Sequence, residues 1–213
     1  MQFNVIDLNS ISSKDLETLD SCYKLWHEVY TPILADAQQS LNKDSFLRAR
    51  FLAVLEKDAE VCCFSLMNTH FTLWKPSVEA SYFSYCSDIT RHLVKSQGLS
   101  LLTVEWLTAN PKYRRKVTGY PANEVLVSLC FQWMKHMGFD AAIGYPRCDF
   151  KSDQVATMMG AKVTESVMRH GIECKVILAH RDSLIMHPET EMAQHIQDLM
   201  NKNFIKYPKQ GAA

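Results

Sequence analysis

Four of the 23 Lys and Arg residues of this sequence lie in one short segment. Four basic residues fall within five positions: Lys112, Arg114, Arg115 and Lys116. The segment follows an apolar stretch, 101–107, that is typical of a buried strand, and it precedes a helical pattern that begins at Ala122. Helix starts expose free N–H groups, and ligands bind at strand ends in open α/β sheets. The segment therefore predicts a phosphate or pyrophosphate site, with a solvated basic loop as the simpler alternative.

Other residues that could act as nucleophiles or metal ligands form no recognisable pattern. A nucleophilic Cys/His pair could in principle be formed by His92 with one of three cysteines, Cys62, Cys63 or Cys86. No third residue that would orient such a pair can be identified, so we interpret these thiols as core residues. His187 and His195 are eight positions apart and lack the His-Glu-x-x-His spacing of a zinc hydrolase. We therefore predict no metal site.

Hydrophobic periodicity predicts the elements that must position the basic segment. Helical spacing is found in 12–30, 44–55, 78–93, 122–137, 149–159 and 188–204, and strand patterns in 60–73, 101–107, 141–145, 163–169 and 172–179. Gly98 and Gly138 are placed to end two of the helices, and His170-Gly171 is typical of a hairpin turn. The order strand, loop, helix, strand over 101–145 predicts a crossover between neighbouring strands.

Composition limits the possible class of protein. In 213 residues, 23 Lys and Arg balance 23 Asp and Glu, which argues against a protein whose whole surface binds nucleic acid. No apolar run approaches the roughly 20 residues of a membrane span. The seven cysteines and the lack of a secretory signal at the start predict reduced thiols and a cytoplasmic location. We expect one domain over 1–213, with N-terminal helices in 1–58, a core in 60–180 and a C-terminal helix in 185–205.

Two segments of this order resemble a known superfamily. Residues 110–119 resemble the acyl-CoA-binding motif of the GNAT superfamily of N-acetyltransferases, Arg/Gln-x-x-Gly-x-Gly/Ala. Arg114 and Gly119 occupy its first and last positions, and Val117 stands at its middle glycine. Residues 158–163 resemble the end of the helix that precedes the superfamily's last hairpin. In element order the resemblance extends over residues 60–180.

Within the superfamily, one branch is more similar than others. The Ser81–Tyr85 segment, a strand with a central Glu, and Pro-x-Tyr-Arg-Arg are similar to long-chain N-acyl amino acid synthases and acyl-homoserine lactone synthases. Those enzymes take acyl groups from acyl carrier protein. Their strand usually carries Arg three residues after the Glu, where this sequence has Thr108.

The resemblance implies a fold, a donor and an acceptor. The fold is an α/β, GNAT-like single domain with a mixed, mostly antiparallel sheet flanked by helices. The donor is acyl-CoA or another acyl-phosphopantetheine, bound by Arg114, Arg115, Lys116, Val117, Thr118 and Gly119. The acceptor is a small-molecule amine. An acidic acyl carrier protein would complement the basic segment as a partner.

The resemblance also implies the roles of two catalytic residues. Glu105, between Val104 and Trp106, is the predicted general base, with a solvent-facing or Arg-paired carboxylate as the alternative. In the superfamily a tyrosine often acts as the general acid, and its position is occupied by Ala156 here. Tyr145, with Tyr120 as a second candidate, is then left to return a proton to the departing thiolate.

The departures at Val117 and Ala156 keep two further functions open. One is a non-catalytic protein of this fold that binds acyl thioesters. The other is an acetyl-CoA-dependent enzyme that acetylates small amines.

Overall fold

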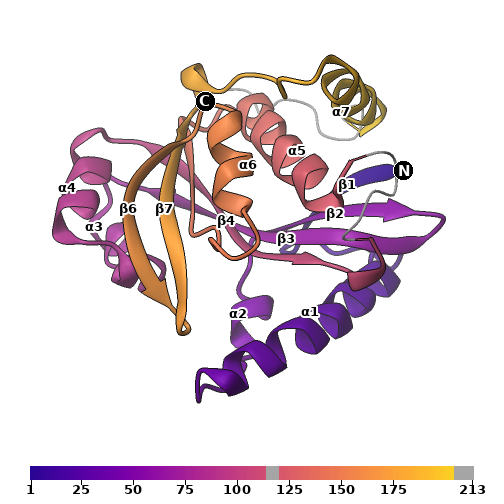
Figure 1. Ribbon diagram of the computed structural model, residues 1–213, viewed down its shortest axis with the longest axis horizontal. Helices are drawn as coiled ribbons and strands as arrows, with labels where there is room; N and C mark the ends of the chain where they lie inside the picture. Colours follow the sequence, from indigo (N-terminus) through magenta and orange to yellow (C-terminus); the bar gives the residue numbers. More distant parts are fainter. Residues whose placement is uncertain (114–119, 204–213) are drawn as a thin grey trace.

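The computed structural model describes residues 1–113 and 120–203, which form one seven-stranded mixed sheet with helices around it (Figure 1). The strands are β1 (Gln2–Asp7), β2 (Phe51–Lys57), β3 (Glu60–Phe71), β4 (Ser100–Ala109), β5 (Ala141–Gly144), β6 (Lys162–Arg169) and β7 (Ile172–His180). Their order across the sheet is β1-β2-β3-β4-β5-β7-β6. Among these seven strands of the described residues, only β4 and β5 are parallel neighbours. The predicted α/β class with a mixed, mostly antiparallel sheet is confirmed.

Helices cover both faces of the sheet (Figure 1). One face carries α5 (Ala122–Met137), α6 (Ser152–Met158) and α7 (Thr190–Asn203); the other carries α1 (Leu16–Asp36) and α2 (Asp44–Leu47). The short helices α3 (Lys75–Val78) and η1 (Ser81–Tyr85) and the helix α4 (Asp88–Ser96) lie together beside the β5–β7–β6 half of the sheet, and η2 (Pro111–Tyr113) and η3 (Arg181–Ser183) are single turns. The described part of the chain contains no helix with the length and apolar character needed to span a membrane.

Within the described residues the hydrophobic core has three parts, and the sheet separates the first from the other two. Below α5, the side chains of Leu126, Leu129 and Trp133 are fully buried against the sheet. Trp26 of α1 fills the opposite face. Phe83 of η1 belongs to a third cluster that covers β5 and β7. Side chains therefore pack both faces of the central strands, which is why these strands are apolar throughout rather than alternating.

Two sequence predictions about the N-terminal region are wrong. The predicted helix over 44–55 is only the single turn α2, and the chain then enters β2; residues 2–7 form β1, so 1–58 is not a helical layer. Leu52, Ala53, Val54 and Leu55 are all 0% exposed. A strand that is buried on both faces loses its period-two pattern, and the remaining apolar run fits a helix equally well.

The predicted helix over 78–93 is also divided. It is replaced by η1 and α4, with a break at Cys86 and Ser87. The Ser87 hydroxyl accepts a hydrogen bond of 3.2 Å from the N–H of Thr90, so Ser87 caps a new helix rather than continuing the old one. By contrast, the predicted helix over 122–137 is confirmed, and Gly138 ends it with a left-handed φ of 81°.

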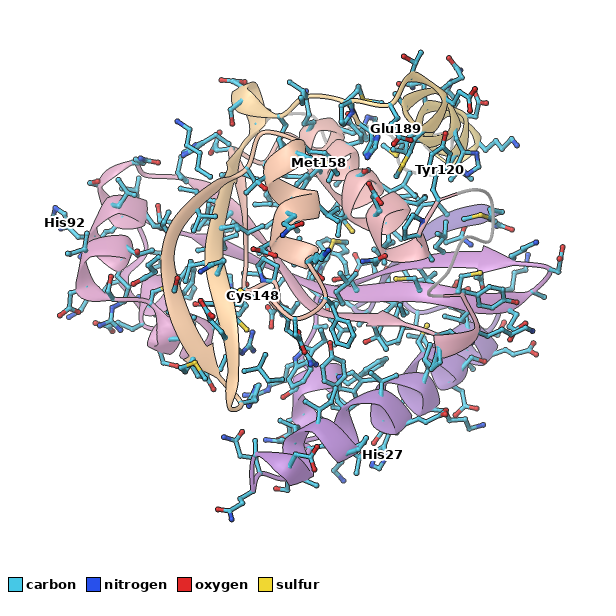
Figure 2. The ribbon with its side chains drawn as sticks, in the orientation of Figure 1. His27, His92, Tyr120, Cys148, Met158 and Glu189 are labelled. Carbon is cyan, nitrogen blue, oxygen red and sulfur yellow. The ribbon has the colours of Figure 1, made fainter. Side chains whose placement is uncertain are left out.

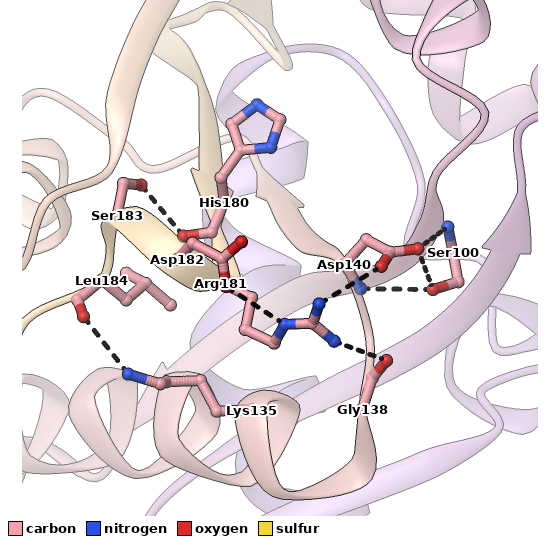
Figure 3. Close-up of polar contacts among 9 residues, drawn as sticks. All are labelled: Ser100, Lys135, Gly138, Asp140, His180, Arg181, Asp182, Ser183 and Leu184. Carbon is pink, nitrogen blue, oxygen red and sulfur yellow. Dashed lines mark hydrogen bonds and ion pairs between the residues drawn. The ribbon is translucent and has the colours of Figure 1, made fainter. Parts of the chain in front are cut away.

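Polar contacts around Asp140 hold one end of the β4–β5 pair (Figure 3). The Asp140 carboxylate accepts hydrogen bonds from the Ser100 N–H at 2.9 Å and from the Ser100 hydroxyl at 2.6 Å. The Arg181 N–H donates to the Asp140 carbonyl at 2.8 Å, and the Arg181 guanidinium donates to the Gly138 carbonyl at 3.3 Å. Ser100 begins β4, Asp140 precedes β5 and Arg181 follows β7, so one cluster ties three strands together at this end.

Candidate active site

The two central strands separate at their other end. Residues 101–104 of β4 pair with residues 141–144 of β5, but β4 continues to Ala109 while β5 ends at Gly144. The register of β3 against β4 shifts near this point, and Trp106 has a positive φ of 51°. A bulge of this kind bends a strand and re-aims its side chains. The sheet is therefore open between β4 and the segment that follows β5.

A cavity of about 550 Å³ occupies this opening. Its walls come from α1, β4, α5, the segment 144–158 and the β6–β7 hairpin. Apolar side chains dominate it, including Val29, Ile33, Leu107, Val127, Phe131, Val155 and Ile177. The polar groups on its walls include Glu105, Tyr145 and Arg169. Its size, and a largely apolar wall with few polar groups, are typical of a site for a small organic ligand.

Glu105 lies on the wall of this cavity and is held by two neutral donors. One of its carboxylate oxygens, Oε1, accepts hydrogen bonds from the Asn68 amide at 3.1 Å and the Thr103 hydroxyl at 2.5 Å. The other oxygen accepts no hydrogen bond from any residue of 1–113 or 120–203, and no arginine pairs with Glu105 there. Glu105 is half-buried, so it has neither the solvent-facing nor the Arg-paired environment that the sequence left open. The geometry leaves one carboxylate oxygen able to accept a proton.

Tyr145 borders the same cavity and is buried. Its hydroxyl donates to the Tyr82 carbonyl at 2.7 Å and lies 3.0 Å from the Cys86 sulfur. Burial raises the pKa of Tyr145 well above its usual value, so the phenol is protonated at neutral pH. Tyr120, the other candidate, lies beside Glu189 near the start of α7 and is not part of the cavity wall (Figure 2).

The six predicted donor-binding residues, Arg114, Arg115, Lys116, Val117, Thr118 and Gly119, lie outside the described residues. The chain on either side of them is described. Before them, Lys112 pairs with Glu60 at 2.6 Å; after them, Pro121, Asn123 and Glu124 at the start of α5 line the cavity. The cavity therefore reaches the helix start that the sequence associated with an anion site.

Glu124 forms a buried pair with His187 beside the cavity. The His187 Nε2 lies 2.8 Å from the Glu124 carboxylate, and the His187 Nδ1 lies 3.2 Å from the Glu189 N–H. Because Nδ1 accepts from a backbone N–H, we assign the proton to Nε2, which donates to Glu124. This pair joins α5 to the segment before α7. No group of three potential metal ligands occurs among the described residues.

Of the described cysteines, Cys174 alone lines this cavity, and the exposed histidines do not line it. His92 projects from the outer side of α4, and His27 from the outer side of α1 (Figure 2). Cys62, Cys63 and Cys86 are buried and free, and burial raises the pKa of each thiol. They are core residues, as the sequence analysis interpreted them.

Two residues of the cavity were missed by the sequence analysis. Tyr30 of α1 was interpreted only as part of an apolar helix face, yet its hydroxyl donates to the Leu107 carbonyl at 2.9 Å. Arg169 ends β6 and points among aromatic side chains. Its position directly before the His170-Gly171 turn carried no sequence signal, because nothing local indicates which residues a hairpin end will meet.

Comparison with known proteins shows similarity at the level of the fold. No protein-family model matches the sequence, and no curated protein matches it significantly. The structure of FeeM, an N-acyl amino acid synthase from uncultured soil microbes, superposes with a TM-score of 0.59 at 7% identity, covering 85% of this chain and 92% of that one.

Two other solved structures are similar. BjaI, a CoA-dependent acyl-homoserine lactone synthase, has a TM-score of 0.59 at 9% identity and covers 94% of this chain and 89% of its own. An acyl-CoA N-acyltransferase from Pseudomonas aeruginosa has a TM-score of 0.52 at 10% identity and covers 84% and 99%. The chain therefore shares the fold of these structures, the GNAT-like fold that the resemblance implied.

Proposed function

We propose that this protein is an N-acyltransferase that moves an acyl group from a phosphopantetheine thioester to the amine of a small molecule. The observation that carries the proposal is the cavity between the parted ends of β4 and β5, with the free carboxylate oxygen of Glu105 on its wall. The fold that this chain shares with acyltransferases supports it. The proposal keeps the cytoplasmic location expected from the sequence.

In the proposed reaction the amine nitrogen attacks the thioester carbonyl carbon. A C–N bond forms, the C–S bond breaks, and the products are an amide and a free thiol. Glu105 accepts the proton lost by the amine, directly or through a water. Tyr145 returns a proton to the departing thiolate. For this step its hydroxyl stops donating to the Tyr82 carbonyl and donates to the thiolate sulfur instead. Each group acts on a proton at a stated atom, and no metal is required.

The donor in this proposal is acyl-CoA or an acyl carrier protein. Residues 114–119, with their three cations and the N–H groups that precede α5, would hold its phosphate groups. The apolar part of the cavity, between α1 and α5, would take the acyl chain. An acidic carrier protein would be attracted by the same cations.

The proposal is tested by measuring donor binding and thiol release separately. Acetyl-CoA, octanoyl-CoA, myristoyl-CoA and an acylated carrier protein are each titrated into the protein in a calorimeter. The same donors are then incubated with a panel of amines, and amide and free thiol are quantified by mass spectrometry. Amide formation in proportion to thiol release is expected. If no donor binds, the proposal is wrong.

A second candidate is a protein that binds acyl thioesters without transferring them. Two observations favour it: Ala156, which the cavity wall presents where the superfamily has an acidic tyrosine, and the engaged hydroxyl of Tyr145. In that case a donor binds with measurable affinity, and no amine of the panel is acylated. Acetylation restricted to acetyl-CoA would instead identify a small-amine acetyltransferase.

A further inference from the structure

The side chains of Asn68 and Thr103 hold Glu105 from the neighbouring strand and from its own strand. The register of β3 against β4 places Asn68 opposite Thr103, and Thr103 and Glu105, two positions apart on β4, share one face of the sheet. The Asn68 amide and the Thr103 hydroxyl both donate to Oε1 of Glu105, at 3.1 and 2.5 Å. Neither of these two described residues lines the cavity. They therefore act on a reaction in the cavity through Glu105.

A second glutamate of the sheet is held by the same kinds of partner in a different way. Glu56 of β2 accepts hydrogen bonds from the Asn4 amide at Oε2 and from the Thr18 hydroxyl at Oε1, each of 3.0 Å. Each oxygen of Glu56 thus has a hydrogen-bond donor. At Glu105 both donors share Oε1, and Oε2 accepts from no described residue. Glu105 lines the cavity and Glu56 does not, so the unequal sharing is found at the glutamate that borders the cavity.

Backbone groups fix the direction of both hydrogen bonds to Glu105. The Arg50 N–H donates to the Asn68 side-chain oxygen at 2.9 Å, which assigns the Asn68 NH2 group to the side of Glu105. The Asn68 main-chain N–H donates to the Thr103 hydroxyl oxygen at 3.1 Å, so the hydroxyl proton is available for Glu105. The Asn68 carbonyl, the other acceptor near that proton, is more distant from the hydroxyl at 3.4 Å. Oε1 of Glu105 therefore meets two hydrogen-bond donors.

Two donors at one oxygen decide where Glu105 can bind a proton. A proton on Oε1 would point at an N–H or an O–H and would displace one of the two hydrogen bonds. A proton on Oε2 displaces neither, because Oε1 of the neutral acid still accepts both. The same hydrogen bonds thus serve the charged and the neutral carboxyl, and no partner has to reorient when the proton is transferred.

We propose that Asn68 and Thr103 are positioning residues that confine proton uptake by Glu105 to its unpartnered oxygen, Oε2. This inference rests on the proposed function, in which Glu105 is the general base, and it extends the site to two residues outside the cavity. Loss of either hydrogen bond leaves Oε1 open to the proton and lets the carboxylate rotate. The amine then meets a misdirected base, so the rate falls while binding of the acyl thioester is retained.

The first arm of the test removes one hydrogen bond and conserves the shape of the side chain. Thr103→Val should lower kcat roughly 10- to 100-fold, the effect of losing a hydrogen bond to a charged group, with the KM for the acyl thioester unchanged. Thr103→Ser keeps the hydroxyl and should recover most of the rate. Thr18→Val is the matched control, since it removes the same kind of hydrogen bond from Glu56 and should leave kcat unchanged. A wild-type kcat in Thr103→Val would overturn the inference and leave the proposed function intact.

The second arm replaces the asparagine by an acceptor of the same shape. Asn68→Asp puts a carboxylate beside Oε1 of Glu105, and two carboxylates at such a distance share a proton. The acid limb of the pH profile of kcat/KM should then move up by about 1 pH unit or more. Asn4→Asp, which puts a carboxylate beside Glu56 in the same way, should leave the profile unchanged. Movement in both variants, or in neither, would contradict the inference.

The other charged and titratable groups around Glu105 are common to all of these variants. Burial raises the pKa of Tyr82 and of Tyr145, so neither phenol titrates near neutral pH. Burial and the Arg169 cation lower the pKa of His170. A shift confined to Asn68→Asp therefore belongs to the introduced carboxylate. The groups contributed by the surrounding elements are His70 of β3, Tyr82 of η1, Tyr145 after β5, Arg169 of β6 and His170 of the β6–β7 turn.

The third arm needs no turnover. The side-chain carboxyl carbon of Glu105, identified by its absence in Glu105→Gln, is followed by carbon NMR through an acid titration of the isotope-labelled chain. Its titration midpoint should rise in Asn68→Asp and stay at the wild-type value in Asn4→Asp. An unchanged midpoint in Asn68→Asp would overturn the inference whether or not an amine is acylated. If no amine is acylated, the proposed function fails, and a raised midpoint still shows that Asn68 controls the protonation of Glu105.

Discussion

The hydroxyl of Tyr30 donates a hydrogen bond of 2.9 Å to the main-chain carbonyl of Leu107. Leu107 belongs to the part of β4 that extends beyond the end of β5, and Tyr30 belongs to α1. The Tyr30 ring also packs edge-on against Trp106, with centroids 4.8 Å apart. Helix α1 therefore donates a hydrogen bond to the part of β4 that extends beyond β5, and it also forms an apolar wall of the cavity.

We expect Tyr30→Phe to lower the free energy of unfolding by about 1–2 kcal/mol, because the Leu107 carbonyl loses its partner in a partly buried place. Urea denaturation measures the change. Tyr23→Phe is the matched control on the same helix, since the Tyr23 hydroxyl has no hydrogen-bond partner in the described part of the chain, and it should change stability by less than about 0.5 kcal/mol. Equal losses in the two variants would contradict a role for the hydroxyl.

Glu105→Gln should lower kcat by roughly 10²–10⁴-fold, the usual contribution of a general base. The glutamine oxygen can still accept from Asn68 and Thr103, so the fold and the donor affinity should be retained. Steady-state kinetics and donor titration measure the two effects. Glu173→Gln, on β7 and paired with Lys175, serves as the control. Unchanged kcat in Glu105→Gln would show that the base has been assigned wrongly.

Gly160→Ala should be much more destabilising than Gly138→Ala. Both glycines have positive φ, 93° and 81°, so each substitution costs about 1–2 kcal/mol in backbone strain. At Gly160 the added methyl group would lie 2.2 Å from the Ser183 carbonyl oxygen, whereas at Gly138 nothing lies within 4 Å. Because backbone must move at Gly160, we expect a further loss of about 1–3 kcal/mol. Chemical denaturation of both variants tests the difference, and similar losses would refute it.

Asp140 should contribute to stability in a pH-dependent way. Burial alone would raise the pKa of Asp140, but hydrogen bonds from Ser100 and the charge of Arg181 lower it below its usual value. A carboxyl whose pKa is lower in the folded state stabilises that state above the unfolded pKa of about 3.9. The contribution is then lost as the pH falls through the folded pKa.

Asp140→Asn tests this dependence. Near neutral pH it should lower the free energy of unfolding by about 1 kcal/mol, a modest value because Asp140 is partly exposed. The difference from the wild type should shrink below about pH 3.9. Asp182→Asn is the control, since Asp182 is 92% exposed and should show little effect at any pH. A difference that stays constant from neutral to acid pH would contradict the assignment.

The local sequence pattern was sufficient to predict those elements whose ends are marked by a residue suited to a helix end or a turn. The helix 122–137 has one apolar face and a glycine at its end, and the hairpin around His170-Gly171 has a turn that accepts positive φ at both positions. Pattern failed over 44–57, because the residues of β2 are buried on both faces and show no alternation. The position of Glu105 on the central strand was predicted; its free oxygen was not.

The sequence by itself therefore determined the order of the main helices and strands over residues 101–203, the apolar central strands and the resemblance to the GNAT fold. Only the tertiary structure decided which side chains share the cavity. Tyr30, Glu105 and Arg169 are far apart along the chain and meet there, because β5 stops at Gly144 while β4 continues, and because the β6–β7 turn reaches α1. Strand register and separation depend on packing among distant segments, and no local sequence pattern records them.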